Sequence, residues 1–159
     1  MAWNLLDISA LRSIELFDKV SDDALVEILS VASTTRYRQG EVLFREGEPG
    51  EALFFILDGA VRISKDIHGI GEEALAILNA GSSFGEMALL DPDTQRSAHA
   101  IADTDCHVGK INRGNFEALL KTDVELANEF LSSFVLTLTR RLRDSNEKIA
   151  FFALNDKYE

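Results

Sequence analysis

The residues best able to do chemistry lie in one stretch, residues 84–98, which reads FGEMALLDPDTQRSA. Gly85 has no Cβ, so a ligand can approach its backbone closely. Arg96 offers a planar fork of donors that suits a phosphate, and Ser97 adds a hydroxyl beside it. Glu86 would repel a phosphate, so we expect it to accept a hydrogen bond from a sugar hydroxyl while Arg96 balances its charge. This division of labour predicts a pocket for a ribose phosphate.

The apolar run inside this stretch also bears on anion binding. If residues 86–90 form one helical turn, the first N–H groups of that turn lack partners within the helix and favour an anion. Each residue alone is weak evidence, because a single arginine is usually a solvated surface residue. The combination of glycine, carboxylate, helical turn and arginine predicts the site.

The stretch resembles the phosphate-binding cassette of the cyclic-nucleotide-binding domain family, which has the form FGE, a small and apolar run, then R, a small residue and A. Upstream, residues 47–63 (GEPGEALFFILDGAVRI) resemble the paired, glycine-punctuated strands of the family. Residues 140–148 (RRLRDSNEK) resemble the central helix of the bacterial catabolite activator, a family member whose sensor domain the chain is similar to. The residues that fit the cassette are Phe84, Gly85, Glu86, Ala88, Leu89, Arg96, Ser97 and Ala98.

This resemblance implies a ligand, cyclic AMP or cyclic GMP, and roles for the cassette residues. It implies that Gly85 and Glu86 contact the ribose, and that Arg96 and the serine after it contact the cyclic phosphate. It also places Ser145 and Asn146 where the activator has its base-contacting hydroxyls. The choice between the two nucleotides stays open. The expected ligand-binding residues are Gly85, Glu86, Met87, Ala88, Arg96, Ser97, Ala98, Ser145 and Asn146.

Composition limits the class of protein. A chain of 159 residues suits a single domain over residues 1–159, and 46% hydrophobic with 27% charged residues argues against disorder. A net charge of -11 gives no general attraction to nucleic acid or to an anionic membrane, so an anion must be bound locally. With one cysteine, Cys106, and neither a signal peptide nor a long apolar run, we expect a cytoplasmic protein without a membrane span.

Metal and catalytic chemistry are disfavoured by the sequence. The three histidines, His68, His99 and His107, form no HxH or HxxxH pattern that would place two nitrogens on one metal. The chain has no Gly-x-Ser-x-Gly elbow and no Walker loop. We therefore expect no metal, no other cofactor and no enzyme activity. A cupin-like enzyme, whose barrel would look similar, is the alternative from another class.

The N-terminal residues 1–32 carry apolar side chains three and four positions apart, which is helical spacing. Ser21 precedes two aspartates and suits an N-cap, so we expect two helices broken near Lys19. These helices pack on the body, or alternatively form a cap that shifts when the pocket fills. The residues that set the spacing are Trp3, Leu5, Leu6, Ile8, Leu11, Ile14, Leu16, Phe17, Leu25, Ile28, Leu29 and Ala32.

Glycines punctuate the central part of the chain, with eight of ten inside residues 40–85. Short apolar runs between regular turns predict an antiparallel β jelly-roll barrel over residues 33–111, within an α+β fold. Asp58 and Gly59 predict a hairpin, because such a turn needs positive φ, and a second hairpin is expected near residues 68–71. The expected strands are Val42–Phe44, Leu53–Leu57, Val61–Ser64, Ala74–Leu78, Ala98–Ala102 and His107–Ile111.

Helical signals dominate the C-terminal residues 112–159. Asn112 can cap a short helix, and Thr122 with Glu125 predicts a capping box that opens a helix running to about Asn155. Apolar residues four and three apart in this helix form a heptad seam with one polar break, which favours a parallel homodimer. The alternative is that the seam packs on the chain's own barrel. The seam residues are Leu131, Val135, Leu138, Leu142, Ser145, Ile149 and Phe152.

The most basic part of the chain lies in the same helix, at Arg140, Arg141, Arg143 and Lys148. Helical spacing spreads these charges, so we expect them to pair with nearby Asp144 and Glu147 or with a partner helix. Only about ten residues follow residue 148, too few to supply a recognition helix with its support, so we expect no direct DNA binding.

These observations predict a cyclic-nucleotide sensor that signals by repositioning its C-terminal helix toward a downstream protein that the sequence does not identify. The alternative within binding proteins is a degenerate cassette domain that serves only for dimerisation.

Overall fold

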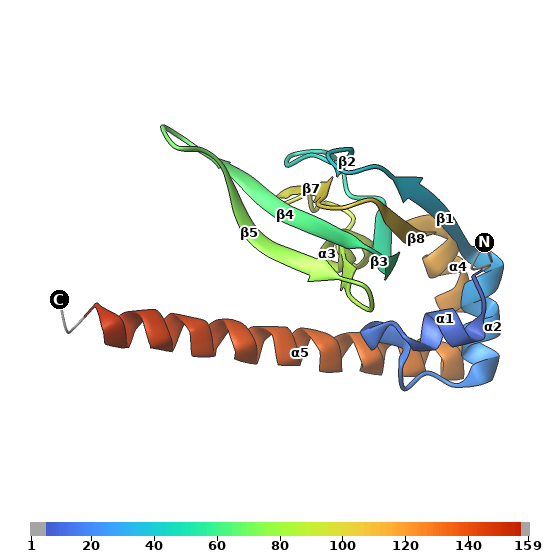
Figure 1. Ribbon diagram of the computed structural model, residues 1–159. Coiled ribbons are helices and arrows are strands. Elements are labelled where there is room, and N and C mark those ends of the chain that lie inside the picture. The colour runs from blue at the N-terminus through green and yellow to red at the C-terminus, as the bar shows by residue number, and fades with distance from the viewer. Residues whose placement is uncertain (1–5, 157–159) are drawn as a thin grey trace.

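The computed structural model describes residues 6–156, which fold into two antiparallel sheets with helices at both ends of the chain. Figure 1 shows the N-terminal helices gathered around the start of the long helix α5, which then extends past the sheets toward the C-terminus. The elements are α1 (Ile8–Arg12), the 3-10 helix η1 (Glu15–Phe17), α2 (Asp22–Val31), β1 (Ala32–Tyr37), β2 (Val42–Phe44), β3 (Ala52–Asp58), β4 (Ala60–Ile67), β5 (Gly71–Asn79), β6 (Ser83–Phe84), α3 (Glu86–Leu90), β7 (His99–Ala102), β8 (Cys106–Asn112), α4 (Arg113–Thr122) and α5 (Val124–Asn155).

The two sheets form the predicted jelly roll. One sheet has the strand order β1-β8-β3-β6 and the other β2-β7-β4-β5, with every pairing antiparallel. Consecutive strands alternate between the sheets in several places, as in a double-stranded β-helix. The α+β fold class with N-terminal helices and a long C-terminal helix is therefore confirmed.

The turn at Asp58 and Gly59 is not a hairpin, so that prediction is wrong. β3 pairs with β6 and β8, whereas β4 pairs with β5 and β7, and the turn therefore carries the chain from one sheet to the other. Gly59 does have φ +82°, and a Cβ there would overlap the backbone carbonyl of Asp105. Asp58 and Gly59 therefore predicted the backbone conformation of the turn correctly, but they did not predict which strands pair. The second hairpin, between β4 and β5, is confirmed by pairing of Ile67 with Gly71.

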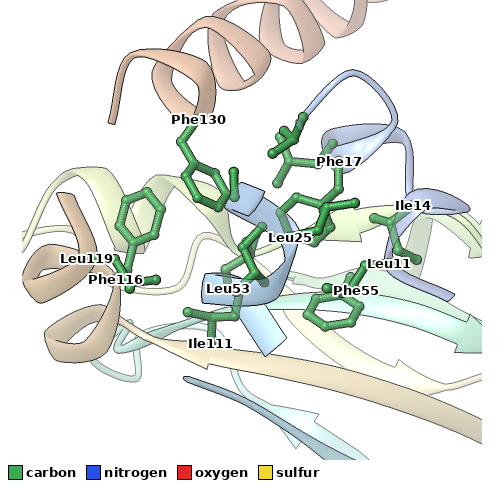
Figure 2. Close-up of a cluster of buried hydrophobic side chains, with 14 of the residues drawn as sticks. Leu11, Ile14, Phe17, Leu25, Leu53, Phe55, Ile111, Phe116, Leu119 and Phe130 are labelled. Carbon is green, nitrogen blue, oxygen red and sulfur yellow. The ribbon is translucent and has the colours of Figure 1, made fainter. Parts of the chain in front are cut away.

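The main core lies between the N-terminal helices, one sheet and the start of α5 (Figure 2). Phe17 of η1 meets Phe55 of β3 and Phe130 of α5 edge to face, with ring centroids 5.6 and 6.1 Å apart. Phe116 of α4 makes a similar contact with Phe130 at 5.7 Å. These aromatic contacts bury one face of α5 against the body.

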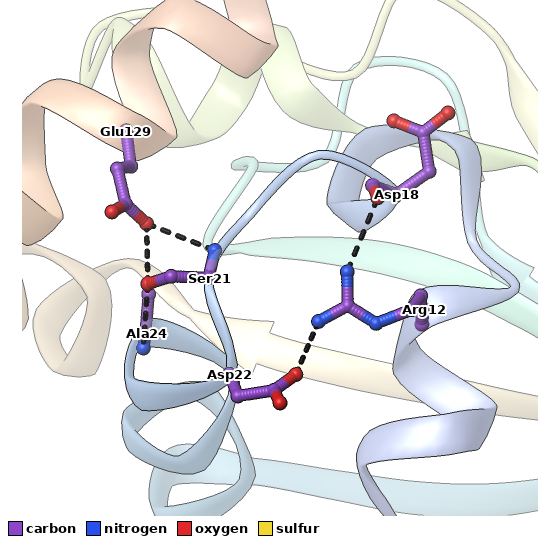
Figure 3. Close-up of polar contacts among 6 residues, drawn as sticks. All are labelled: Arg12, Asp18, Ser21, Asp22, Ala24 and Glu129. Atoms are coloured by element: carbon purple, nitrogen blue, oxygen red, sulfur yellow. Dashed lines mark hydrogen bonds and ion pairs between the residues drawn. The ribbon is translucent and has the colours of Figure 1, made fainter.

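Polar contacts tie the N-terminal helices together and to α5 (Figure 3). Ser21 caps α2 as predicted, because its hydroxyl accepts from the backbone N–H of Ala24 at 3.3 Å. The same serine donates through its hydroxyl and its backbone N–H to the carboxylate of Glu129, at 2.8 and 3.1 Å. Arg12 bridges the Asp18 carbonyl and the Asp22 carboxylate. The predicted break before Ser21 is confirmed, while Trp3 and Leu5 lie outside the described residues.

The two C-terminal helices begin differently from the prediction. Asn112 stands at the N-cap position of α4, but its side chain makes no capping hydrogen bond. The capping box of Thr122 with Glu125 is wrong, because Asp123 is the N-cap of α5 and accepts from the backbone N–H of Glu125 at 2.9 Å. Thr122 belongs to the last turn of α4, where its hydroxyl donates to the carbonyl of Leu119. The end of α5 at Asn155 agrees with the sequence.

The heptad seam of α5 does not pack on the chain's own barrel. Leu126, Phe130 and Phe134 face the body and are buried, whereas the seam residues Leu142 and Ile149 are 63% and 65% exposed. From residue 142 to residue 156 every position is exposed. Apart from the half-buried Leu138, the apolar residues of the seam are exposed, so packing against the body does not account for the seam. No helix within residues 6–156 combines the length and the apolar character needed to cross a membrane.

Candidate ligand-binding site

A cavity of about 200 Å³ opens beside α3, at the stretch where the sequence places the site. Its apolar lining includes Phe44 of β2, Ile63 of β4 and Leu78 of β5, and Arg141 of α5 also lines it. Phe84, Thr94 and Gln95 of the cassette stretch also line it. The expected site residues that line it are Gly85, Glu86, Met87, Ala88, Arg96, Ser97 and Ala98. The structure thus brings together seven of the nine expected site residues.

The other two expected site residues, Ser145 and Asn146, do not line this cavity. Both are exposed on α5, about one helical turn beyond Arg141, the residue through which the helix reaches the cavity.

Arg96 is the most unusual residue of the cavity, because it is a cation that is only 7% exposed. Its Nη2 donates to the Ala52 carbonyl at 2.9 Å, its Nη1 donates to the Gly85 carbonyl at 3.4 Å, and its Nε makes no hydrogen bond. The guanidinium carbon lies 4.1 Å from the ring centroid of Phe44. Within residues 6–156, no carboxylate forms an ion pair with it.

The electrostatics of Arg96 follow from this burial. Desolvation lowers the pKa of the Arg96 guanidinium, while the carboxylates of Glu48 and Glu86 act in the opposite direction. A buried charge normally has a partner of opposite sign, because leaving water is costly. An anion in the cavity would supply the partner that the described residues do not.

Local backbone geometry explains how the sequence holds Arg96 in place. Gly85 has φ +79° and is the N-cap of α3, which confirms the predicted helical turn. A Cβ at Gly85 would lie 2.7 Å from Nη1 of Arg96 and 3.0 Å from the Ala52 carbonyl oxygen. Only glycine satisfies both the positive φ and the close approach of the guanidinium.

The backbone of Arg96 is fixed from the other side by the segment that follows β2. The carbonyl of Arg96 accepts from the N–H of Gly47 at 2.9 Å, and the N–H of Arg96 donates to the carbonyl of Glu48 at 2.8 Å. Pro49 forms an isolated bridge with Gln95. The backbone of Arg96 is therefore held in a short antiparallel pairing with residues 47–49.

Glu86 forms an ion pair with Arg141, not with Arg96 as the sequence suggested. Nη1 of Arg141 lies 3.2 Å from Oε1 of Glu86, whose side chain is 14% exposed. Arg141 also donates to the carbonyl and the hydroxyl of Ser83 in β6. One arginine of α5 therefore joins the helix to the cavity.

The expected pairing of the basic run with Asp144 and Glu147 is also wrong for the two arginines that the structure pairs. Arg140 pairs with Glu15 at 3.7 Å, and Arg141 pairs with the cassette, because these positions of α5 face the body. Sequence reasoning missed the site role of Arg141, since nothing in its local pattern separates it from Arg140 or Arg143.

A metal centre finds no support in this part of the molecule. Within residues 6–156, no group of three or more His, Cys, Asp or Glu side chains is placed to hold a metal ion.

Comparison with known sequences decides the family. The sequence model of the cyclic nucleotide-binding domain matches residues 34–123, more than half of the chain. The chain belongs to the cyclic nucleotide-binding domain family. The match confirms the resemblance seen in the cassette. It ends before α5, so Arg141, Ser145 and Asn146 lie outside the matched part of the family.

Relatives of this cyclic nucleotide-binding domain include kinases and bacterial receptors. The cGMP-dependent protein kinase 2 of Mus musculus is 34% identical over 134 residues, which are 82% of this chain and 17% of the kinase. The cyclic AMP receptor protein of Thermus thermophilus is 30% identical over 141 residues, 89% of this chain and 63% of the receptor. The chain thus spans about a sixth of the kinase and less than two thirds of the receptor.

Solved structures agree with the family. A cyclic nucleotide-binding domain from Methylobacillus flagellatus has a TM-score of 0.78 at 30% identity, covering 89% of this chain and 79% of that one. The regulatory domain of Toxoplasma gondii PKA, crystallised with cAMP, has a TM-score of 0.62 at 28% identity, covering 69% of this chain and 41% of that one.

Proposed function

We propose that the cavity binds cyclic AMP or cyclic GMP and that the protein is a regulatory sensor of that ligand. The observation that carries this proposal is the buried Arg96, which has no ion-pair partner among residues 6–156 and lines the same cavity as Glu86. A cyclic phosphodiester would supply one negative charge at the arginine. Relatives named for cyclic AMP and cyclic GMP support the same ligand class. The proposal involves no reaction, metal or other cofactor.

Calorimetry with matched nucleotides tests this proposal. A cyclic monophosphate carries one negative charge. Its linear 5′ counterpart carries more negative charge, which Arg96 attracts but the carboxylate of Glu86 repels. We expect the cyclic form to bind more tightly than the linear form. If neither cyclic AMP nor cyclic GMP gives heat or a thermal shift at high concentration, the sensor fails and the alternative of a domain used only for dimerisation gains support.

The role of Glu86 can be tested separately. We infer that its carboxylate accepts a hydrogen bond from the ribose 2′-hydroxyl, since a carboxylate can accept but not donate. The variant Glu86→Ala should therefore lose more affinity for the ribose ligand than for the 2′-deoxy ligand. Equal losses for the two ligands would show that Glu86 does not read the hydroxyl.

We infer that the ligand acts on α5 through Glu86. A ribose hydroxyl and the guanidinium of Arg141 would compete for the same carboxylate, which now lies 3.2 Å from Arg141. Beyond Arg141 every described residue of α5 is exposed, so this contact is the last one that ties the helix to the cavity. Ligand binding would weaken that contact and reposition the helix, which would carry the signal to a downstream protein.

The same helix is the proposed homodimer contact. Its exposed seam, including Leu142 and Ile149, would be buried by a parallel partner helix. Ser145 and Asn146 would then stand near the base, once the helix has moved over the filled cavity. We propose that residues 1–159 form one domain. The family match gives no support to a cupin-like enzyme.

A further inference from the structure

A histidine lies on the same segment as Arg96 and outside the cavity lining. His99 is the first residue of β7 and is nearly buried. Its Nδ1 accepts a hydrogen bond from the backbone N–H of Glu46 at 3.0 Å, and its Nε2 lies 3.0 Å from Oδ2 of Asp66 in β4. Because a backbone N–H can only donate, Nδ1 must be unprotonated, and the proton of the neutral ring is on Nε2, where it is donated to Asp66.

The hydrogen bond between His99 and Glu46 lies between two paired regions of the backbone. In the first region, Phe44 of β2 pairs with Ala100 of β7. In the second, the backbone of Arg96 hydrogen-bonds to Gly47 and Glu48. Glu46 falls between these two paired regions, where the regular ladder is interrupted. The imidazole of His99 supplies the acceptor for its N–H there, and so joins the two parts of the ladder.

We propose that neutral His99 is a positioning residue for Arg96, and that its protonation releases the segment 46–49 and weakens anion binding in the cavity. This inference rests on the proposed function, because it concerns the affinity of the same site. A protonated Nδ1 would present an N–H to the N–H of Glu46, and two donors cannot form a hydrogen bond. The segment that fixes the backbone of Arg96 would lose one of its anchors.

The charged groups around the ring set the balance of this effect. Asp66 on β4 faces Nε2, and it keeps its hydrogen bond whether or not Nδ1 is protonated. Lys65 of the same strand is 3.4 Å from the carboxylate of Glu46, so these two charges pair with each other. Farther along the sheet, Arg62 pairs with Glu72 and Asp103. The positive charge of a protonated His99 would therefore lie next to the carboxylate of Asp66. The weaker anion binding in the cavity would come from the lost hydrogen bond to Glu46.

Two variants of His99 separate this role from simple packing. His99→Asn keeps an oxygen acceptor near the position of Nδ1 and cannot titrate, whereas His99→Phe keeps a ring and has no acceptor. We expect acidification to lower the affinity of wild type for the cyclic nucleotide about three- to tenfold, which is the worth of one hydrogen bond. The affinity of His99→Asn should not change with pH, and His99→Phe should bind weakly at every pH.

Controls isolate His99 from the other histidines. His68 and His107 are present in wild type and in His99→Asn, so the difference between the two profiles belongs to His99. His68 lies on the exposed hairpin tip, and His68→Asn should retain the wild-type pH profile. If wild type and His99→Asn lose affinity equally on acidification, the proposal is overturned.

A readout without nucleotide distinguishes failure of this inference from failure of the proposed function. In a ¹⁵N NMR titration, the amides of Glu46, Gly47 and Arg96 should shift together with the His99 ring in wild type. They should not shift in His99→Asn. If the protein binds no cyclic nucleotide, the proposed function fails, and this titration still decides the positioning role. Amides that stay unmoved while the ring titrates would overturn it.

Discussion

Nη1 of Arg141 lies 3.2 Å from Oε1 of Glu86, which joins the long C-terminal helix to the carboxylate of the cavity. The two residues lie far apart in the sequence, in α3 and in α5. Ser83 also accepts hydrogen bonds from Arg141. A group that hydrogen-bonds to Glu86 would therefore share its carboxylate with Arg141 of α5.

Arg141→Gln should loosen the second half of α5 in the absence of ligand. The variant loses an ion pair and weakens the contact with Ser83, together worth about 1 kcal/mol for a partly exposed pair. Hydrogen exchange of residues 138–150 should therefore become faster. Arg143→Gln is the matched control, because Arg143 is exposed on the same helix. Equal exchange in the two variants would show that the Glu86 contact does not hold the helix.

Arg96→Met should change the free energy of unfolding of the unliganded protein by no more than about 2 kcal/mol in either direction. The variant removes a buried cation that has no ion pair within residues 6–156, which favours folding. It also removes the donor of two hydrogen bonds to the carbonyls of Ala52 and Gly85, which opposes folding. Urea unfolding followed by circular dichroism measures this. A loss of more than about 3 kcal/mol would mean that the arginine serves the fold and not a ligand.

Gly85→Ala should destabilise the fold by at least about 2 kcal/mol and also reduce ligand affinity. The alanine would be strained at φ +79°, and its Cβ would push against Nη1 of Arg96. Gly69→Ala is the matched control, because Gly69 has φ +81° but nothing within 4 Å of an added Cβ. The control should cost only about 1 kcal/mol of backbone strain and leave affinity unchanged. Similar affinity losses in both variants would contradict the contact argument.

Leu138→Glu combined with Leu142→Glu should convert a dimer to monomers in sedimentation velocity. The two substitutions place four like charges in one seam of a symmetric pair, where repulsion and desolvation oppose association. Ala150→Glu with Leu154→Glu is the control, because both residues are exposed on the same helix outside the seam. A wild type that sediments as a monomer with and without nucleotide would rule out the dimer.

The cassette could be predicted from sequence because its parts are contiguous. Gly85, Glu86, Arg96 and Ser97 lie within one short stretch, and the positive φ of the glycine is a local property. Several strands were also predictable, since glycines separate their apolar runs within residues 40–85. α5 ends at Asn155, as its helical pattern indicates.

What the sequence could not show depends on distant contacts. Arg141 reaches the cavity only through the path of α5 over the body, and its neighbours in sequence are equally basic. β1 was missed because its residues, ASTTRY, are mostly exposed and lack apolar alternation. Gly59 has the positive φ that the sequence predicts. The predicted hairpin is absent because β3 pairs with β8, whereas β4 pairs with β7 in the other sheet. The base contacts of Ser145 and Asn146, the cytoplasmic location and the absence of DNA binding stay predictions.

The central claim is that Arg96 binds the phosphate of a cyclic nucleotide, and calorimetric titration of wild type beside Arg96→Met tests it most directly. We predict that wild type binds cyclic AMP or cyclic GMP, and that the variant, folded by the criterion above, loses about 2 to 5 kcal/mol of binding free energy, as expected when one side of a buried charge pair is removed. Binding of equal strength by wild type and Arg96→Met would contradict the claim.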